Sequence, residues 1–309
     1  MNERIVWMGT PSISAEVLEA LLEEGFPIVA VVAQKDKPVG RKGNIVPVPV
    51  KEVALKYGLP VYQPEKIKED YAWLKELKPT LLLTLAYGQI VPQEVLDIPT
   101  KGALNLHGSL LPKYRGAAPM QYAIKNGEKE TGMCLMRMVK AMDAGEVYDK
   151  EVVAIDEKET TATLEKKMIG AAIILAKRAI PLYLEGKLVG VPQDESKVTF
   201  APSIRREEEH LPLHLSAMDA VHYIRSLNNH PGAYVLVDGQ KLKIWDAEVS
   251  SHEVSAPVGS FVEISKKGVI LQLCDGQISC LQLQKEGKGK VSWKDFANAH
   301  QNWVGKIVS

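Results

Sequence analysis

One stretch organises the whole chain. It reads Gly102-Ala-Leu-Asn-Leu-His-Gly-Ser-Leu-Leu-Pro-Lys-Tyr-Arg-Gly-Ala-Ala-Pro119. Asn105 and His107 alternate with two leucines, so an extended backbone places the carboxamide and the imidazole on one face. A loop and a helix beginning near Ala117 are expected to follow, because proline is tolerated in a first helical turn. A strand that delivers polar side chains into such a loop indicates an α/β active site, although a core histidine and a turn asparagine would show the same pattern.

The segments on the N-terminal side of this stretch predict a parallel sheet. An apolar strand at residues 4–9, an amphipathic helix at 14–24 and a β-branched strand at 28–33 form a βαβ pattern. The continuous apolar run at 79–86 is typical of a central strand that is buried on both faces. Ligands bind at the carboxyl ends of such strands, so we expect the loop at 87–92 to lie beside the end of the Asn105 strand.

The sequence lacks the motifs of several classes of cofactor site. The first strand turn has only Gly9, whereas a dinucleotide fingerprint needs two more glycines, and no phosphate-binding glycine loop with Lys-Ser or Lys-Thr occurs. The three cysteines have no metal-ligand spacing. His210 and His214 have the spacing of a helical metal pair, but Pro212 lies between them and no third ligand is evident. We therefore expect no metal site.

The composition is that of an ordinary globular protein with room for two domains. The 309 residues are 46% apolar and 25% charged, and 38 basic residues balance 38 acidic ones. Any nucleic-acid site must therefore be a local basic patch. The N-terminus has no signal-type apolar core and no apolar run has the length of a membrane helix, so a cytoplasmic location without membrane association is expected.

A long basic loop at residues 34–49 is the first candidate for such a patch. Loops of this length without structure of their own are usually functional or disordered. Four basic residues stand against the single acidic Asp36: Lys35, Lys37, Arg41 and Lys42. This pattern suits contacts to phosphates, with a solvated linker as the alternative.

The C-terminal part of the chain changes character after a long amphipathic helix at residues 163–186. Periodicity fades over 190–206, which we interpret as a linker between a domain at 1–189 and a domain at 207–309. The second domain contains about five short strands separated by glycine turns, which predicts a small antiparallel barrel of the OB type. Four lysines between 285 and 294 form a second local basic segment.

Several motifs together resemble the methionyl-tRNA formyltransferase family, whose members are folate-dependent formyltransferases. The resemblance covers nearly the whole chain, and its residues are Met8-Gly-Thr-Pro11, Gly40-Arg-Lys-Gly43, Asn105-Leu-His107, Ser109–Pro119 and Met142-Asp-Ala-Gly145. The Asn-x-His motif with a downstream aspartate is shared by all folate-dependent formyltransferases of this fold. The run from Ser109 and the basic loop are narrower signals. Alone, Asp143 would be read as a turn former.

The resemblance implies a Rossmann-like catalytic domain and an OB-like domain that binds tRNA. The implied reaction transfers the formyl group of 10-formyltetrahydrofolate to the α-amino group of methionyl-initiator tRNA. Asn105 and His107 would hydrogen-bond the tetrahedral oxyanion, and Asp143 would orient His107 and raise its basicity. The same three residues would also serve an N-formyltransferase acting on a nucleotide amino sugar, which is the alternative.

The resemblance also implies where the substrates bind. The folate would be held by seven residues, the last three through their backbone: Ser109, Leu110, Leu111, Pro112, Leu85, Tyr87 and Gln89. Arg41 would enter the acceptor-stem end of the tRNA, with Lys42 beside it. The barrel would contact phosphates on the inside of the L-shaped tRNA, and the enzyme is expected to be a monomer.

Overall fold

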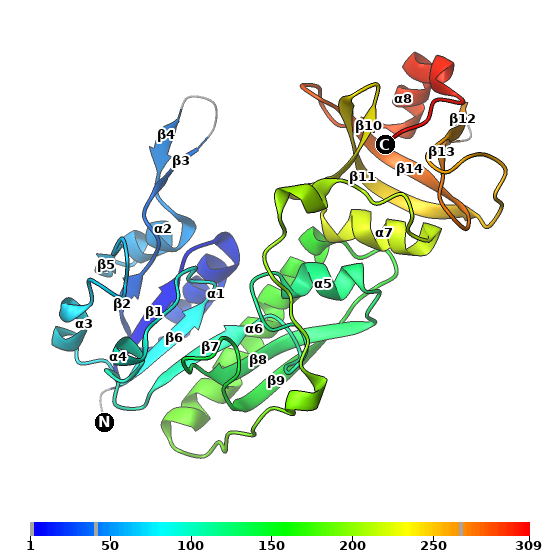
Figure 1. Cartoon of the computed structure of the whole chain (residues 1–309). Helices are drawn as coiled ribbons and strands as arrows, with labels where there is room; N and C mark the ends of the chain where they lie inside the picture. The colour runs from blue at the N-terminus through cyan, green and yellow to red at the C-terminus, as the bar shows by residue number, and fades with distance from the viewer. Residues whose placement is uncertain (1–2, 40–42, 266–267) are drawn as a thin grey trace. The chain divides into compact units, whose positions relative to one another are not determined.

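The computed structural model describes residues 3–39, 43–265 and 268–309. Within these residues the chain forms two compact units, each assembled from separate segments (Figure 1). The first unit comprises residues up to Gly116, Thr131–Val153 and Glu165–Phe200. The second comprises Ala117–Glu130, Ala154–Leu164 and Ala201–Ser309. None of the described helices is both long and apolar enough to cross a membrane.

The first unit is built on a seven-stranded sheet in the order β5-β2-β1-β6-β7-β8-β9. Its strands are β1 (Ile5–Gly9), β2 (Ile28–Val32), β5 (Val61–Tyr62), β6 (Leu81–Leu85), β7 (Ala103–His107), β8 (Glu130–Arg137) and β9 (Val147–Ala154). Strands β5, β2, β1, β6 and β7 are parallel, and β8 runs antiparallel to β7. The predicted α/β class with a mostly parallel sheet is confirmed, and β6 is the central strand expected from its apolar run.

Helices cover both faces of this sheet. They are α1 (Ser12–Glu23), α2 (Pro49–Lys56), α3 (Ala72–Glu76), α4 (Gln93–Leu96) and α6 (Thr161–Leu184), the last of which has its first four residues in the second unit. Alternate residues of β1 point to opposite faces: Val6 and Met8 pack with residues of α3 and α4, whereas Trp7 donates its indole N–H to Ser14 of α1. Such two-sided burial explains why the central strands have no polar alternation.

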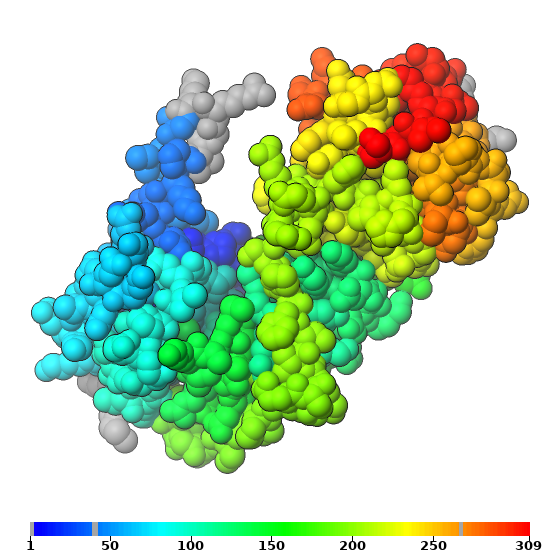
Figure 2. All heavy atoms as spheres, viewed as in Figure 1, coloured from blue at the N-terminus to red at the C-terminus, as the bar shows by residue number. Residues whose placement is uncertain are grey.

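One expectation for the first unit was wrong in part. The loop at 34–49 has structure of its own, since β3 (Lys37–Val39) and β4 (Asn44–Val46) pair antiparallel. Figure 2 shows the described part of this hairpin standing clear of the rest of the first unit, and Ile45 is 72% exposed.

The second unit packs helices against an antiparallel sheet. The helices are α5 (Pro119–Lys125), α7 (Ala217–Ser226) and α8 (Trp293–His300). The strands β10 (Ala233–Val237), β11 (Gln240–Ser251), β14 (Gln277–Lys285), β13 (Gly268–Gln272) and β12 (Phe261–Ser265) pair in that order, and β15 (Val291–Ser292) pairs with β14. An apolar core that includes Phe261 and Phe296 fills the interior. The predicted second domain with an antiparallel sheet is confirmed.

Residues 305–309 close this sheet on itself. On one side, Ser309 exchanges two backbone hydrogen bonds with Leu236 of β10 (2.7 and 3.0 Å). On the other side, Phe261 of β12 donates its N–H to the carbonyl of Lys306 (2.9 Å), and Val308 donates to Gly259 (2.8 Å). β10 and β12 are the edge strands of this sheet. Because residues 305–309 pair with both of them, the sheet closes into a barrel.

Candidate active site

The site lies where the strand order of the first sheet reverses, between β1 and β6. Thr10, just after β1, donates its hydroxyl to the carbonyl of Tyr87 after β6 (2.8 Å) and accepts the N–H of Gln34 after β2 (3.2 Å). One side chain thus ties together the loops that follow three neighbouring strands. Gly9 leaves room for this turn: a Cβ there would lie 1.8 Å from the Ser14 hydroxyl and 2.8 Å from the Leu85 carbonyl. Gly9 therefore serves close packing and not a dinucleotide.

His107 ends β7 with both ring nitrogens facing protein acceptors. It is 5% exposed, and its Nε2 lies 2.9 Å from the carbonyl oxygen of Tyr114. Because a carbonyl only accepts, we assign the ring hydrogen to Nε2. Nδ1 is then the basic nitrogen of the neutral ring, and it lies 3.6 Å from Oδ2 of Asp143. A proton taken up at Nδ1 would be stabilised by this carboxylate.

Asp143 is fixed by the backbone around it. Its φ of 51° lies in the left-handed region, which costs a non-glycine residue free energy. Its Oδ2 accepts the N–H of Gly116 (2.9 Å), so the loop after β7 and the turn after β8 are joined at the carboxylate. Asp143 is therefore more than a turn former, because its carboxylate is directed at His107.

Asn105 lies two residues before His107 and is half-buried. Among the residues that the structure describes, none hydrogen-bonds its carboxamide. A half-buried amide with free N–H groups beside a histidine–carboxylate pair is suited to hold a developing negative charge.

Cys134 is the neighbour of His107 across the β7–β8 ladder. Burial raises the pKa of its thiol to about 11. The group therefore stays a neutral thiol and is not a nucleophile.

The predicted folate-binding loop after β7 is held by its own contacts. Ser109 is fully buried and donates its hydroxyl to the carbonyl of Lys113 (2.6 Å). Leu110 packs over Gly132 of β8, where an added Cβ would lie 2.7 Å from it, and Leu111 and Pro112 are half-buried. The Ser109 hydroxyl thus shapes the loop, and the loop borders the His107 side chain through the Tyr114 carbonyl.

The loop after β6 presents backbone at the same edge. Ala86 and Gly88 have φ of 52° and 91°, and Leu85 and Tyr87 are buried. The side-chain amide of Gln89 bonds to neighbouring backbone. Its oxygen accepts the N–H of Ile67, and its nitrogen donates to the carbonyls of residues 64 and 65. Its side chain is therefore structural, and only backbone in this loop remains for a ligand.

Arg41 and Lys42 lie outside the described residues, but the base of their hairpin is described. Asp36 accepts from Lys51 (2.5 Å), Gln63 (2.8 Å) and the N–H of Val48 (3.2 Å). Lys35 pairs with exposed Glu65 (2.6 Å). Of the basic residues counted in this segment, Lys35 is thus engaged in an ion pair within the first unit.

Sequence reasoning missed the residues that tie the loops together: Thr10, Tyr114, Arg115, Gln193 and Thr199. Thr10 could have been suspected from its place in a Gly-Thr-Pro turn after the first strand. The others act through contacts between segments far apart in the chain, which no local pattern reveals.

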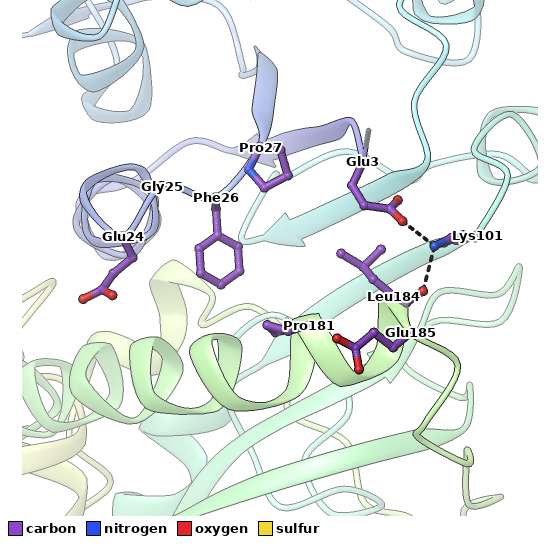
Figure 3. Close-up of a pocket in the computed structure, with 9 residues that line it drawn as sticks. All are labelled: Glu3, Glu24, Gly25, Phe26, Pro27, Lys101, Pro181, Leu184 and Glu185. Carbon is purple, nitrogen blue, oxygen red and sulfur yellow. Dashed lines mark hydrogen bonds and ion pairs between the residues drawn. The ribbon is translucent and has the colours of Figure 1, made fainter. Parts of the chain in front are cut away.

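The opposite edge of the sheet has a surface cavity of about 530 Å³ (Figure 3). Lys101 is held there by Glu3 and by the carbonyl of Leu184 (2.7 Å). Glu24 and Glu185 pair with lysines 177 and 187. Each of these charges has a partner, and the cavity lies at the amino ends of the strands, at the edge opposite His107. We therefore assign no catalytic role to the cavity.

Comparison with known families identifies the class of protein. The family model described as "Formyl transferase" matches residues 3–180, and "Formyl transferase, C-terminal domain" matches residues 203–301. The chain therefore has both domains of a formyl transferase.

Individual relatives narrow the class. Methionyl-tRNA formyltransferase of Bacillus subtilis is 40% identical over 308 residues, which covers 99% of this chain and 97% of the relative. The protein of that name from Malacoplasma penetrans is 42% identical and covers 97% of this chain and 94% of its own length. This chain belongs to the methionyl-tRNA formyltransferase family, which confirms the resemblance seen in the sequence.

Solved structures share the fold at low identity. WlaRD, a sugar 3N-formyl transferase solved with dTDP and 5-N-formyl-THF, superposes with a TM-score of 0.66 at 20% identity, covering 94% of this chain and all of its own. Methionyl-tRNA formyltransferase from Clostridium thermocellum superposes with a TM-score of 0.56 at 15% identity, covering 81% and 94%. These likenesses show the fold alone.

Proposed function

We propose that this chain transfers the formyl group of 10-formyltetrahydrofolate to the α-amino group of methionyl-initiator tRNA. The observation that carries the proposal is the unpaired carboxamide of Asn105 beside the His107–Asp143 pair at the carboxyl edge of the sheet. Full-length relatives at about 40% identity that are named methionyl-tRNA formyltransferase support the same acceptor.

The three side chains supply what formyl transfer needs. As the amine nitrogen bonds to the formyl carbon, the carbonyl electrons move to oxygen, and the amide of Asn105 donates a hydrogen bond to that oxyanion. Nδ1 of His107 takes the proton of the attacking amine, and Asp143 stabilises the resulting imidazolium. When the carbon–nitrogen bond to the folate breaks, the same proton passes to the leaving nitrogen. Since Nε2 is engaged by Tyr114, any contact from His107 to the oxyanion also comes from the Nδ1 edge.

The residues at the edge fit a folate donor. The loops after β6 and β7 offer backbone polar groups and half-buried apolar side chains, and the amide of Asn105 is free to hydrogen-bond a formyl oxygen. We propose that Leu85–Gln89 line the pterin through backbone and that Ser109–Pro112 shape the wall opposite. Solved relatives of the same fold were crystallised with tetrahydrofolic acid or 5-N-formyl-THF.

The tRNA contacts are proposed for two separate places. The hairpin that bears Arg41 and Lys42 is exposed in its described part, which suits entry toward an acceptor stem. In the second unit, lysine ammonium groups lie over aromatic rings, as with Lys290 over Trp245 (3.6 Å) and Lys241 over Tyr234 (4.0 Å). Such lysines can meet backbone phosphates. We further propose that the enzyme acts as a monomer in the cytoplasm. We also propose that residues 1–189 form the catalytic domain and residues 207–309 the tRNA-binding domain, with a linker at 190–206 between them.

The amino-sugar alternative is not favoured, because relatives about 40% identical over nearly the whole chain are named methionyl-tRNA formyltransferase, whereas two sugar formyltransferases of this fold are about 20% identical. The deciding assay offers three acceptors with 10-formyltetrahydrofolate: methionyl-initiator tRNA, elongator methionyl-tRNA and a nucleotide amino sugar. We expect selective formylation of the initiator. His107→Ala should abolish turnover while tRNA binding persists. Formylation of the sugar alone would overturn the substrate and leave the donor and the three catalytic residues in place.

A further inference from the structure

We propose that residues 191–199, which the sequence marks as part of a linker, form a strap that positions the His107–Asp143 pair, with Gln193 and Thr199 as its positioning residues. Both ends of the strap are fixed to the first unit. Val191 exchanges two backbone hydrogen bonds with Val147 of β9 (2.9 Å each). At the other end, the N–H of Arg115 donates to the carbonyl of Thr199 (2.9 Å).

Gln193 holds the backbone of the Asp143 turn. Its Nε2 donates to the carbonyl oxygen of Asp143 (2.7 Å) and to that of Gly145 (2.8 Å). Asp143 is in the left-handed conformation, which persists only where the surroundings hold it. The two hydrogen bonds from one amide supply that restraint, and the turn aims the carboxylate at Nδ1 of His107.

Arg115 sets the orientation of the Gln193 amide. Its Nε and Nη2 donate to Oε1 of Gln193 (3.1 and 2.9 Å), so the amide nitrogen must face the two carbonyls. The guanidinium is buried, and Glu195 of the strap pairs with it (2.7 Å), which offsets the cost of burying its charge. Glu195 of the strap thus supplies the counter-charge for Arg115 in the loop after β7.

Thr199 holds the other partner of the pair. Its hydroxyl accepts the N–H of Tyr114 (2.9 Å), whose φ of 61° is also left-handed. The carbonyl of the same tyrosine accepts from Nε2 of His107. One end of the strap therefore acts on the aspartate and the other on the histidine ring.

The inference rests on the proposed function, and kinetics of the full chain test it. Misplacing catalytic groups by about 1 Å can cost roughly 100-fold in rate. We expect Gln193→Ala and Thr199→Val each to lower kcat by about 10–100-fold, with KM for folate and tRNA within about two-fold of wild type. Thr199→Ser, which keeps the hydroxyl, should restore the rate. Lys197→Ala is the matched control on the same strap, since Lys197 forms its ion pair with Asp194 and not with the catalytic loops, and it should leave kcat unchanged. Equal kcat in Gln193→Ala and Lys197→Ala would overturn the role of Gln193.

A double-mutant cycle separates this inference from the proposed function. If Gln193 acts through Asp143, Gln193→Ala should lower the rate no further in an Asp143→Ala background. A further loss equal to that in the wild-type background would overturn the inference. Wild-type activity in Asp143→Ala would instead refute the proposed role of Asp143. Ring ¹⁵N signals of His107 give a readout independent of turnover: Thr199→Val should lower the share of the Nε2–H tautomer, and unchanged signals would remove Thr199 from the strap's role.

Discussion

At the scale of single residues, the site depends on which polar atoms are left unpaired. The loops around it are closed by internal hydrogen bonds: the Ser109 hydroxyl, the Gln89 amide and Nε2 of His107 all have protein partners. Nδ1 of His107 faces the carboxylate of Asp143 (3.6 Å), so among the three proposed catalytic side chains it is the Asn105 amide that has no partner in the described residues. That amide is therefore free to meet a substrate.

The first prediction concerns Asn105. Asn105→Ala should lower kcat by about 100–1000-fold, since one oxyanion donor contributes that much in comparable sites. The KM for methionyl-tRNA should stay near the wild-type value because the amide acts chiefly on the charged intermediate. Steady-state kinetics with both substrates varied would measure this. A raised KM with unchanged kcat would instead make Asn105 a ground-state binding residue.

A second residue-scale prediction concerns Asp36 at the base of the hairpin. Partial burial raises the pKa of its carboxyl, but hydrogen bonds from Lys51, Gln63 and the N–H of Val48 together lower the pKa below its ordinary 3.8. The unfolded chain then binds the proton more readily, so the stabilisation is full above pH 3.8 and is lost as the pH falls through the folded pKa. Unfolding in urea between pH 6 and pH 3 should show a steeper loss for wild type than for Asp36→Asn. Parallel curves for the two proteins would contradict this.

At the scale of elements, the sequence predicts those helices and strands that local patterns determine. Apolar runs and the βαβ pattern predicted the strands of the parallel sheet, and Gly186 marked the end of α6 to within a few residues. The helix α8 also had a local signal, because Ser292 caps it by accepting the N–H of Asp295.

The elements that were missed depend on contacts between distant segments. The turn at residues 67–69 is tied to the loop after β6, since the side chain of Gln89 accepts the N–H of Ile67 (2.8 Å), a partner that no local pattern reveals. The strap is likewise a run of polar residues and turns, and its contacts with Arg115 and Asp143 join positions far apart in the chain. Of the three proposed catalytic residues, Asn105 and His107 were already marked by their alternation on one strand, whereas Asp143 was singled out only because its motif resembles a known family.

The closure of the barrel leads to an element-scale prediction. Val308 is 2% exposed and lies in the segment between β10 and β12, whereas its neighbour Ile307 is 61% exposed. Val308→Ala should lower the free energy of unfolding by about 1–3 kcal/mol. Ile307→Ala, the matched control, should change it by less than about 0.5 kcal/mol. Tryptophan fluorescence during urea unfolding would report the change, because Trp303 packs against Phe261 in the same core. Equal effects of the two substitutions would contradict closure by this segment.

At the scale of the whole molecule, charge is balanced overall and basic residues act locally. Since 38 basic residues match 38 acidic ones, the protein has no net field to draw in tRNA from a distance. Specific contacts to phosphates must then provide the electrostatic part of the affinity. Binding should therefore weaken with salt in proportion to the number of those contacts.

This expectation can be tested at Arg41. Arg41→Ala should reduce the slope of log Kd against log salt concentration by about 1, which is the change expected for one lost phosphate contact. Lys187→Ala removes an exposed lysine that pairs with Glu185 beside the cavity at the opposite edge, and it should leave the slope unchanged. Filter binding of methionyl-tRNA at several salt concentrations would measure both. An unaltered slope for Arg41→Ala would return the loop at 34–49 to the role of a solvated linker.

The strap has a consequence for how the enzyme is made. A ribosome synthesises the chain from its N-terminus, so Asn105, His107 and Asp143 emerge well before Gln193 and Thr199. A nascent chain that ends before the strap would carry every catalytic group yet lack the contacts that aim two of them. The first unit would therefore reach its full activity only once residue 199 has left the exit tunnel, when the strap fixes the histidine and the aspartate in place.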